Sequence, residues 1–232
     1  MPYCAGPRRG RRNVRDTAGA ATGLRERKKE RTREALVDAA QELFLRKGYD
    51  ATTIDEIVAA VEVSRRTFFR YFAGKEEVAL ARAMEFEQLF LSALATRPAD
   101  EAPLTALRRA GTEVLSEFGD EPADGAGHEF LRMRRLIEGT PVLLAASLRN
   151  AIELERRMAA EIARREGLTP ELDRRPALLV TLYHSVMRVA MDEWTEDEVM
   201  DTAGLSRIVE AAWDDMATLL ADRWTAGELR RD

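Results

Sequence analysis

Cysteine and histidine are scarce in this sequence, and their scarcity excludes several kinds of site. Cys4 is the single cysteine among 232 residues, so neither an intrachain disulfide nor a cysteine-based zinc site can form. The two histidines, His128 and His184, are far apart in the chain, which disfavours a histidine-rich metal site. We therefore expect no metal and no cofactor.

Aromatic residues and long hydrophobic runs are also scarce. Aromatic residues make up 6% of the chain, and Ala, Leu, Glu and Arg dominate, which favours helices over a β-sandwich. No stretch approaches the roughly 18 consecutive apolar residues of a transmembrane helix. The arginine-rich start has no apolar run of signal-peptide length. These features predict a soluble, cytoplasmic protein without membrane contact.

The net charge of −5 conceals two parts of opposite sign. Residues 1–76 carry 17 Lys and Arg against 11 Asp and Glu, whereas residues 77–232 carry 19 against 30. A basic end on an acidic body is typical of a part that binds polyanions joined to a part that avoids them. A solvated, disordered tail has the same charge pattern, so charge alone does not decide between the two readings.

Apolar residues recur at helical spacing along most of the chain, and no convincing β alternation occurs. This periodicity predicts an all-α protein. Residues 1–24 mix Pro, Gly, Arg, Ala and Thr without a period and are predicted to be a disordered basic arm. Helices are predicted at 26–47, 53–60, 65–71, 74–96, 103–118, 127–138, 141–166, 175–195 and 204–224.

Two short predicted helices in the basic part are joined by a tight turn. Thr53 and Glu56 have the spacing of a capping box at the start of the first helix, and Ser64 suits the N-cap of the second. This arrangement is typical of a helix-turn-helix, whose second helix lies in the major groove of DNA. An ordinary helical hairpin with solvated charges is the alternative reading.

The residue types around this motif suit DNA. Arg65 and Arg66 can read guanine or hold phosphates, and Thr67 offers a hydroxyl and a methyl group to bases. Residues at helix starts and beyond the recognition turn can bind the phosphate backbone. Phe68 and Phe72, four residues apart, are expected in the core, with Phe69 facing the DNA. The candidate DNA-binding residues are Thr53, Ser64, Arg65, Arg66, Thr67, Phe69, Arg70, Tyr71 and Lys75.

The pattern from Ala35 to Val78 resembles the N-terminal domain of tetracycline-repressor (TetR) family regulators. The positions that carry the resemblance are Leu43-Phe44, Gly48-Tyr49, Thr52-Thr53-Ile54, Ile57-Val58, Val63-Ser64, Thr67-Phe68-Phe69, Tyr71-Phe72 and Lys75-Glu76. The resemblance implies a homodimer that binds a near-palindromic operator and represses until a small molecule binds its C-terminal domain. It also implies a DNA-binding helix-turn-helix domain over 25–76 and a helical ligand-binding and dimerisation domain over 77–232.

This sequence departs from the family pattern at two positions. Glu62 stands in the turn where the family often has glycine, which predicts an altered turn or a strained φ. Phe69 stands where the family often has tyrosine, so a hydroxyl that contacts phosphate is missing there.

Residues 77–220 resemble, more loosely, regulators with an acyl-CoA-like ligand-binding domain, including mycofactocin-associated regulators. The candidate ligand-binding residues are Met133, Arg134, His184, Met187, Arg188 and Met191, since methionines can line an adaptable tunnel and arginines can bind phosphates. Core packing and surface ion pairs are the alternative roles for them. The apolar stripes of 175–195 and 204–224 are expected to form the dimer interface that the resemblance implies.

Two other functions compete with that of a ligand-released repressor. An enzyme is not expected, because no nucleophile–base arrangement, phosphate-binding glycine loop or HExxH motif occurs. A DNA-binding regulator whose C-terminal domain only dimerises, or binds a protein partner, remains the alternative.

Overall fold

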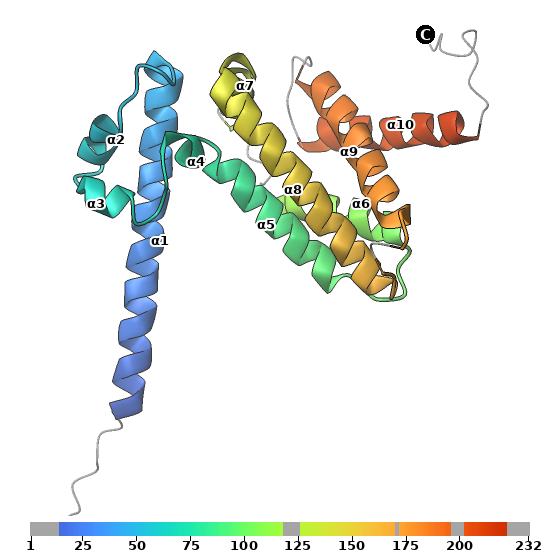
Figure 1. Ribbon diagram of the computed structural model, residues 1–232, viewed down its shortest axis with the longest axis horizontal. Helices are drawn as coiled ribbons and strands as arrows, with labels where there is room; N and C mark the ends of the chain where they lie inside the picture. The colour runs from blue at the N-terminus through green and yellow to red at the C-terminus, as the bar shows by residue number, and fades with distance from the viewer. Residues whose placement is uncertain (1–13, 118–125, 170–171, 196–201, 222–232) are drawn as a thin grey trace, which may run out of the picture.

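A computed structural model describes residues 14–117, 126–169, 172–195 and 202–221 of the chain (Figure 1). Over these ranges the protein is all-α, with helices and no strand, as its periodicity predicts. None of the helices in these ranges is long and apolar enough to cross a membrane. The predicted role of His128 in any site lies outside the side chains that the structure describes.

The N-terminal part consists of a long helix with two short ones against it. These are α1 (Val14–Lys47), α2 (Ile54–Ala60) and α3 (Arg65–Phe68). Because α1 begins at Val14, the prediction of a disordered arm over 1–24 is wrong for residues 14–24, and residues 1–13 lie outside the described ranges. Alanine and arginine favour helix, and a helix that is already nucleated extends easily through such residues.

The C-terminal part is a bundle of the remaining helices. These are α4 (Lys75–Ala79), α5 (Ala81–Thr96), α6 (Pro103–Glu117), α7 (Ala126–Gly139), α8 (Pro141–Arg165), α9 (Arg175–Trp194) and α10 (Thr202–Leu220). The predicted single helix over 74–96 is broken at Leu80, whose φ of −95° and ψ of 3° lie outside the helix. The break allows Val78 to pack into the N-terminal core while Phe90 packs into the C-terminal one.

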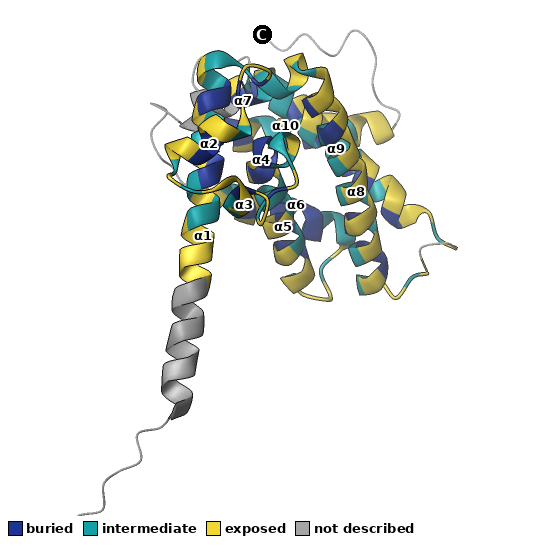
Figure 2. Ribbon diagram, turned by 60° about the vertical axis from the view of Figure 1, so that its left-hand side comes forward, coloured by how far each residue is buried: buried dark blue, intermediate teal, exposed yellow. Residues whose placement is uncertain are grey.

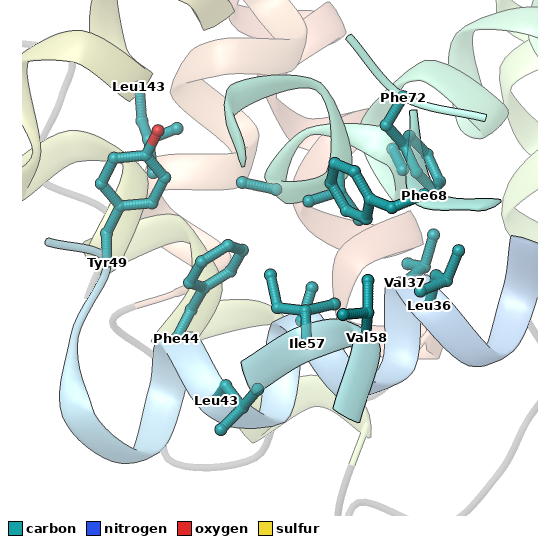
Figure 3. Packing of buried hydrophobic residues seen from close by; sticks show 14 residues of the cluster. Leu36, Val37, Leu43, Phe44, Tyr49, Ile57, Val58, Phe68, Phe72 and Leu143 are labelled. Carbon is teal, nitrogen blue, oxygen red and sulfur yellow. The ribbon is translucent and has the colours of Figure 1, made fainter. Parts of the chain in front are cut away.

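Two buried cores follow this division, as the dark bands in Figure 2 show. The N-terminal core gathers apolar residues of α1 to α4, among them Phe44, Ile57 and Phe68. Leu143, from the first turn of α8, is fully buried in that same core, near Tyr49 and Phe44 (Figure 3). The two parts of the chain therefore share a hydrophobic core at the α7–α8 corner.

The second core fills the C-terminal bundle. It is built from α5, α6, α8, α9 and α10 and includes Phe90, Leu107, Met158, Tyr183 and Trp213. These helices have one apolar side each, so packing them together removes those sides from water. The bundle thereby holds α5 in place, and α5 in turn continues from α4 beside the DNA-binding candidate residues.

Candidate nucleic-acid interface

The start of α2 is fixed by the predicted capping box. The Thr53 hydroxyl accepts a hydrogen bond from the Glu56 backbone N–H (3.3 Å), and the Glu56 carboxylate accepts from the Thr53 backbone N–H (2.9 Å). Lys47, at the end of α1, also donates to Glu56. The hydrogen bonds from Lys47 and Thr53 lower the pKa of Glu56 to about 2. Thr53 is exposed, but its hydroxyl is already used in this cap.

The turn between α2 and α3 has the hydrogen bonds of a Schellman motif. The Val63 N–H donates to the Val58 carbonyl (3.0 Å) and the Glu62 N–H to the Ala59 carbonyl (3.2 Å). The position between them requires a left-handed backbone, and Glu62 occupies it with a φ of 55°. The strained φ that the sequence predicts at Glu62 is confirmed, because a turn of this geometry needs that conformation whatever residue is present.

The recognition segment is shorter as a helix than the predicted 65–71. The α-helix α3 ends at Phe68, and the backbone continues in hydrogen-bonded turns that reach Phe72. Ser64 caps it as expected, with its hydroxyl accepting from the Thr67 N–H (3.1 Å). Phe68 and Phe72 are buried, so their packing fixes the rotation of this segment on α1.

The opposite side of this segment faces solvent and carries the predicted DNA-reading residues. Arg65 and Arg66 are exposed at its start, and Phe69, 50% exposed, lies beyond them. The predictions that Phe68 and Phe72 are core and that Phe69 points outward are both confirmed. An Arg65 N–H lies 3.4 Å from a carboxylate oxygen of Asp55 on α2, a contact between exposed groups that DNA can replace at little energetic cost.

Arg70 and Tyr71 form a pair at the end of the recognition segment. The Arg70 guanidinium donates to the Tyr71 hydroxyl (3.0 Å) and lies 4.9 Å from the centre of its ring. This pair places a cation and a hydroxyl together at the edge of the exposed face, where a phosphate would be expected. Thr67 is half-buried, and its hydroxyl lies 3.0 Å from that of Ser64.

Lys75 has a structural role that the sequence pattern did not reveal. Its ammonium donates to the carbonyls of Tyr49 (3.0 Å) and Thr52 (2.8 Å) and lies 4.3 Å from the centre of the Tyr49 ring. Burial, with the nearby Glu76 carboxylate, raises the pKa of the Tyr49 hydroxyl. Lys75 thus ties the loop after α1 to the start of α4, which leaves one of its three N–H donors for a phosphate.

The candidate ligand-binding residues do not converge on one site. Arg134 and Arg188 both pair with Asp192, and His184 lies 3.2 Å from Glu155. Met187 packs on the C-terminal core, whereas Met191 packs on a separate cluster around Trp194 and Leu205, and Met133 is buried. These contacts are those of packing and ion pairs, the alternative that the sequence left open for these residues.

A groove of about 550 Å³ opens at the far end of the bundle, away from these residues. Its lining comes from the ends of α6, α8 and α9: Pro103, Ile162, Glu166, Leu168, Arg175, Pro176, Leu178, Leu179 and Leu182. A groove of this size can hold a small molecule. None of the six candidate ligand-binding residues lines it.

Comparison with known proteins agrees with this architecture. A family model described as "Bacterial regulatory proteins, tetR family" matches residues 36–81, and one described as "MftR C-terminal domain" matches residues 101–221. The chain is 45% identical over 205 residues to the HTH-type transcriptional regulator TcmR of Streptomyces glaucescens, which covers 87% of this chain and 90% of TcmR. The chain belongs to the TetR family. It is a TetR-family transcriptional regulator with an MftR-type C-terminal domain.

Solved structures of other TetR-like regulators have the same fold. SmeT, the repressor of the Stenotrophomonas maltophilia multidrug efflux pump SmeDEF, is 20% identical with a TM-score of 0.52, covering 86% of this chain and 96% of SmeT. NalD, the secondary repressor of the Pseudomonas aeruginosa pump MexAB-OprM, is 18% identical with a TM-score of 0.52, covering 80% and 95%. At these identities the likeness shows the shared all-α fold alone.

Proposed function

We propose that this TetR-family regulator binds a near-palindromic operator as a homodimer and is released from it by a small molecule. The observation that carries the proposal is the exposed face of the recognition segment, where Arg65, Arg66 and Phe69 point away from a well-packed core. Such a face can enter the major groove without unfolding anything, and guanidinium groups there can read guanine.

The proposed dimer interface lies on α9 and α10. Leu178 and Val189 on α9 are 61% and 51% exposed, and Leu219 on α10 is 50% exposed, although other residues of the same helices are buried. Large exposed apolar side chains on neighbouring helices are typical of a protein–protein interface. A symmetric pair of such faces would place two recognition segments about one helical turn of DNA, roughly 34 Å, apart.

The proposed route of release runs through α4 and α5. α4 is tied to the loop after α1 by Lys75, and α5 is tied to α1 by a hydrogen bond from Arg82 to Asp38 (2.6 Å). A ligand that moves α5 would therefore move the recognition segment. A near-complete switch requires the ligand to favour the released state by about 5.5 kcal/mol, roughly ten-thousandfold in affinity.

Binding of the purified protein to its own upstream DNA tests the proposal. Fluorescence anisotropy at several salt concentrations, with and without palmitoyl-CoA, separates specific from purely electrostatic binding. Tight sequence-specific binding that palmitoyl-CoA releases supports both the regulator and an acyl-CoA effector. Tight binding that palmitoyl-CoA leaves unchanged supports the regulator and excludes this effector. Binding no tighter than to random DNA contradicts an operator at this position.

A C-terminal domain that only dimerises, or binds a protein partner, is the second candidate. The pairing of Arg134 and Arg188 with Asp192 favours it, because these cations are already neutralised in the free protein. A thermal-shift screen discriminates the two, since a small molecule that binds the folded state raises the melting temperature. Shifts with hydrophobic small molecules favour the effector, and their absence across the screen favours the protein partner.

A further inference from the structure

Trp213, on α10, has a buried N–H group without an acceptor. The side chain is 6% exposed, and its indole Nε1 has no hydrogen-bond partner within the described ranges of the chain. A buried donor that makes no hydrogen bond destabilises the fold, so such groups are uncommon and call for an explanation. Binding an acceptor from a ligand is one way in which the group can be used.

The surroundings of Trp213 are aromatic. The Tyr183 ring lies 6.0 Å from Trp213 and 5.6 Å from Phe90, measured between ring centres, so α5, α9 and α10 each contribute one ring. Their interplanar angles of 36° and 46° are far from parallel stacking, in which a flat molecule would pack better. Three rings from three helices make an apolar site for another flat ring.

Gly111, on α6, makes room for the Tyr183 hydroxyl. A Cβ atom at this position would overlap with that hydroxyl, so no side chain is compatible with the present placement of Tyr183. The phenol is buried, and burial raises its pKa, which keeps it protonated and able to donate. The site therefore offers two neutral donors, an indole N–H and a phenol O–H, among apolar rings.

The site is closed towards solvent on one side and adjoins the groove on another. The Arg108 guanidinium lies 5.4 Å from the centre of the Trp213 ring and pairs with Glu210 of α10, which covers that ring. Ile162 and Leu179 belong both to the lining of the groove and to the core that holds Tyr183 and Trp213. A molecule in the groove thus contacts the outer side of the aromatic core.

We propose that the effector is an uncharged, flat aromatic molecule with a carbonyl or phenol oxygen, bound among Phe90, Tyr183 and Trp213. Its oxygen accepts from the Trp213 indole N–H, and its ring packs against the three aromatic side chains. The proposal rests on the effector-released function above and places the site apart from Arg134, His184 and Arg188. Because Phe90 lies on α5, separating the rings to admit a ligand moves the helix that Arg82 ties to α1.

The test uses two flat probes of the same ring size, 1,8-dihydroxyanthraquinone, which carries oxygen acceptors, and anthracene, which carries none. Their affinities for the full chain are measured by quenching of tryptophan fluorescence and confirmed by calorimetry. Trp213→Phe keeps an aromatic ring and removes the donor. We expect it to weaken the anthraquinone about tenfold, the usual effect of losing one hydrogen bond, and to leave anthracene unchanged. Trp194→Phe, the same change at a buried tryptophan of another cluster, is the matched control and should alter neither affinity.

Gly111→Ala is the second variant. Its methyl group displaces the Tyr183 hydroxyl, so we expect weaker binding of both probes, with circular dichroism and thermal unfolding reporting whether the fold is kept. Equal anthraquinone affinity in wild type and Trp213→Phe overturns the proposal, as does failure of the anthraquinone to bind wild type.

Operator release, measured by anisotropy with the same probe, distinguishes this proposal from the proposed function. Binding that depends on Trp213 and releases the DNA supports both. Binding that depends on Trp213 and leaves the protein on DNA supports the site and contradicts release by this class of effector. Release by palmitoyl-CoA together with no anthraquinone binding overturns the site and leaves the repressor function supported.

Discussion

Arg82 of α5 donates a hydrogen bond to Asp38 of α1, with 2.6 Å between Nη2 and Oδ1. The same guanidinium donates to Glu85 (3.1 Å), which also accepts from Arg33 of α1. These charged groups lie next to the buried α7–α8 corner, where Leu143 enters the N-terminal core. The two parts of the protein are therefore joined by both a polar and an apolar contact, so a movement in one has a physical path to the other.

Leu143→Ala should destabilise the protein more than a surface change on the same turn does. The side chain is fully buried among residues of the N-terminal core, so its truncation leaves a cavity and lowers the free energy of unfolding by about 2–5 kcal/mol. The exposed neighbour Leu144 is the control, and Leu144→Ala should change it by about 0.5 kcal/mol or less. Urea denaturation measures both, and equal effects would contradict the shared core.

Arg65→Ala and Arg66→Ala should each weaken operator binding by about 1–3 kcal/mol if the two guanidinium groups read bases. Both side chains are exposed at the start of the recognition segment, so neither change should lower thermal stability appreciably. Arg164→Ala, which removes an exposed arginine of α8, is the matched control and should leave the affinity unchanged. Anisotropy titrations with operator and with random DNA measure the effect. Unchanged operator affinity in both variants would sink the assignment of the recognition segment.

Glu62→Gly should stabilise the protein by up to about 1 kcal/mol, because glycine adopts the left-handed conformation without the steric clash that a Cβ atom causes. The φ of Glu62 is 55°, and its side chain is exposed. Glu62→Ala retains the Cβ atom and should give no comparable gain. Chemical denaturation of the two variants compares them directly, and a loss of stability in Glu62→Gly would show that the Glu62 side chain makes a compensating contact.

Stability should fall as the pH drops below the usual pKa of histidine, and His184 should be one cause. Burial lowers the pKa of His184 below 6.5, although the Glu155 carboxylate at 3.2 Å opposes the shift. The unfolded chain then binds a proton more readily than the folded one, so the contribution of neutral His184 is complete above pH 6.5 and decreases below it. Melting temperatures from about pH 8 to about pH 5 should decline less in His184→Gln than in wild type. An identical decline in both would contradict the shift.

Val189→Glu should dissociate the proposed dimer, because it places a charge in the centre of the exposed apolar face of α9. Leu148→Glu is the control, since Leu148 is equally exposed but lies on α8, outside the proposed interface. Sedimentation velocity measures the oligomeric state of both. A monomeric Leu148→Glu together with a dimeric Val189→Glu would move the interface from α9 and α10 to α8.

Much of the fold and half of the candidate DNA-binding site could be read from local sequence patterns. Helix bounds follow from apolar periodicity and from caps such as Ser64, because these depend on residues a few positions apart. The burial of Phe68 and Phe72 and the exposure of Phe69 follow from the same periodicity. The strained Glu62 could be predicted because a turn between two helices has few allowed geometries.

The remaining features depend on residues that are distant in the chain. Arg134 pairs with Asp192, 58 positions away, and Lys75 binds carbonyls of a loop more than 20 positions before it. The entry of Leu143 into the N-terminal core and the rings that meet at Trp213 are likewise set by how the helices pack. The sequence by itself determined the helices and their exposed DNA-binding face, since local hydrogen bonding and amphipathicity produce them. Only the tertiary structure decided which charges are paired, which donor is left without an acceptor and where the two parts join, because these follow from packing between segments that the chain does not place side by side.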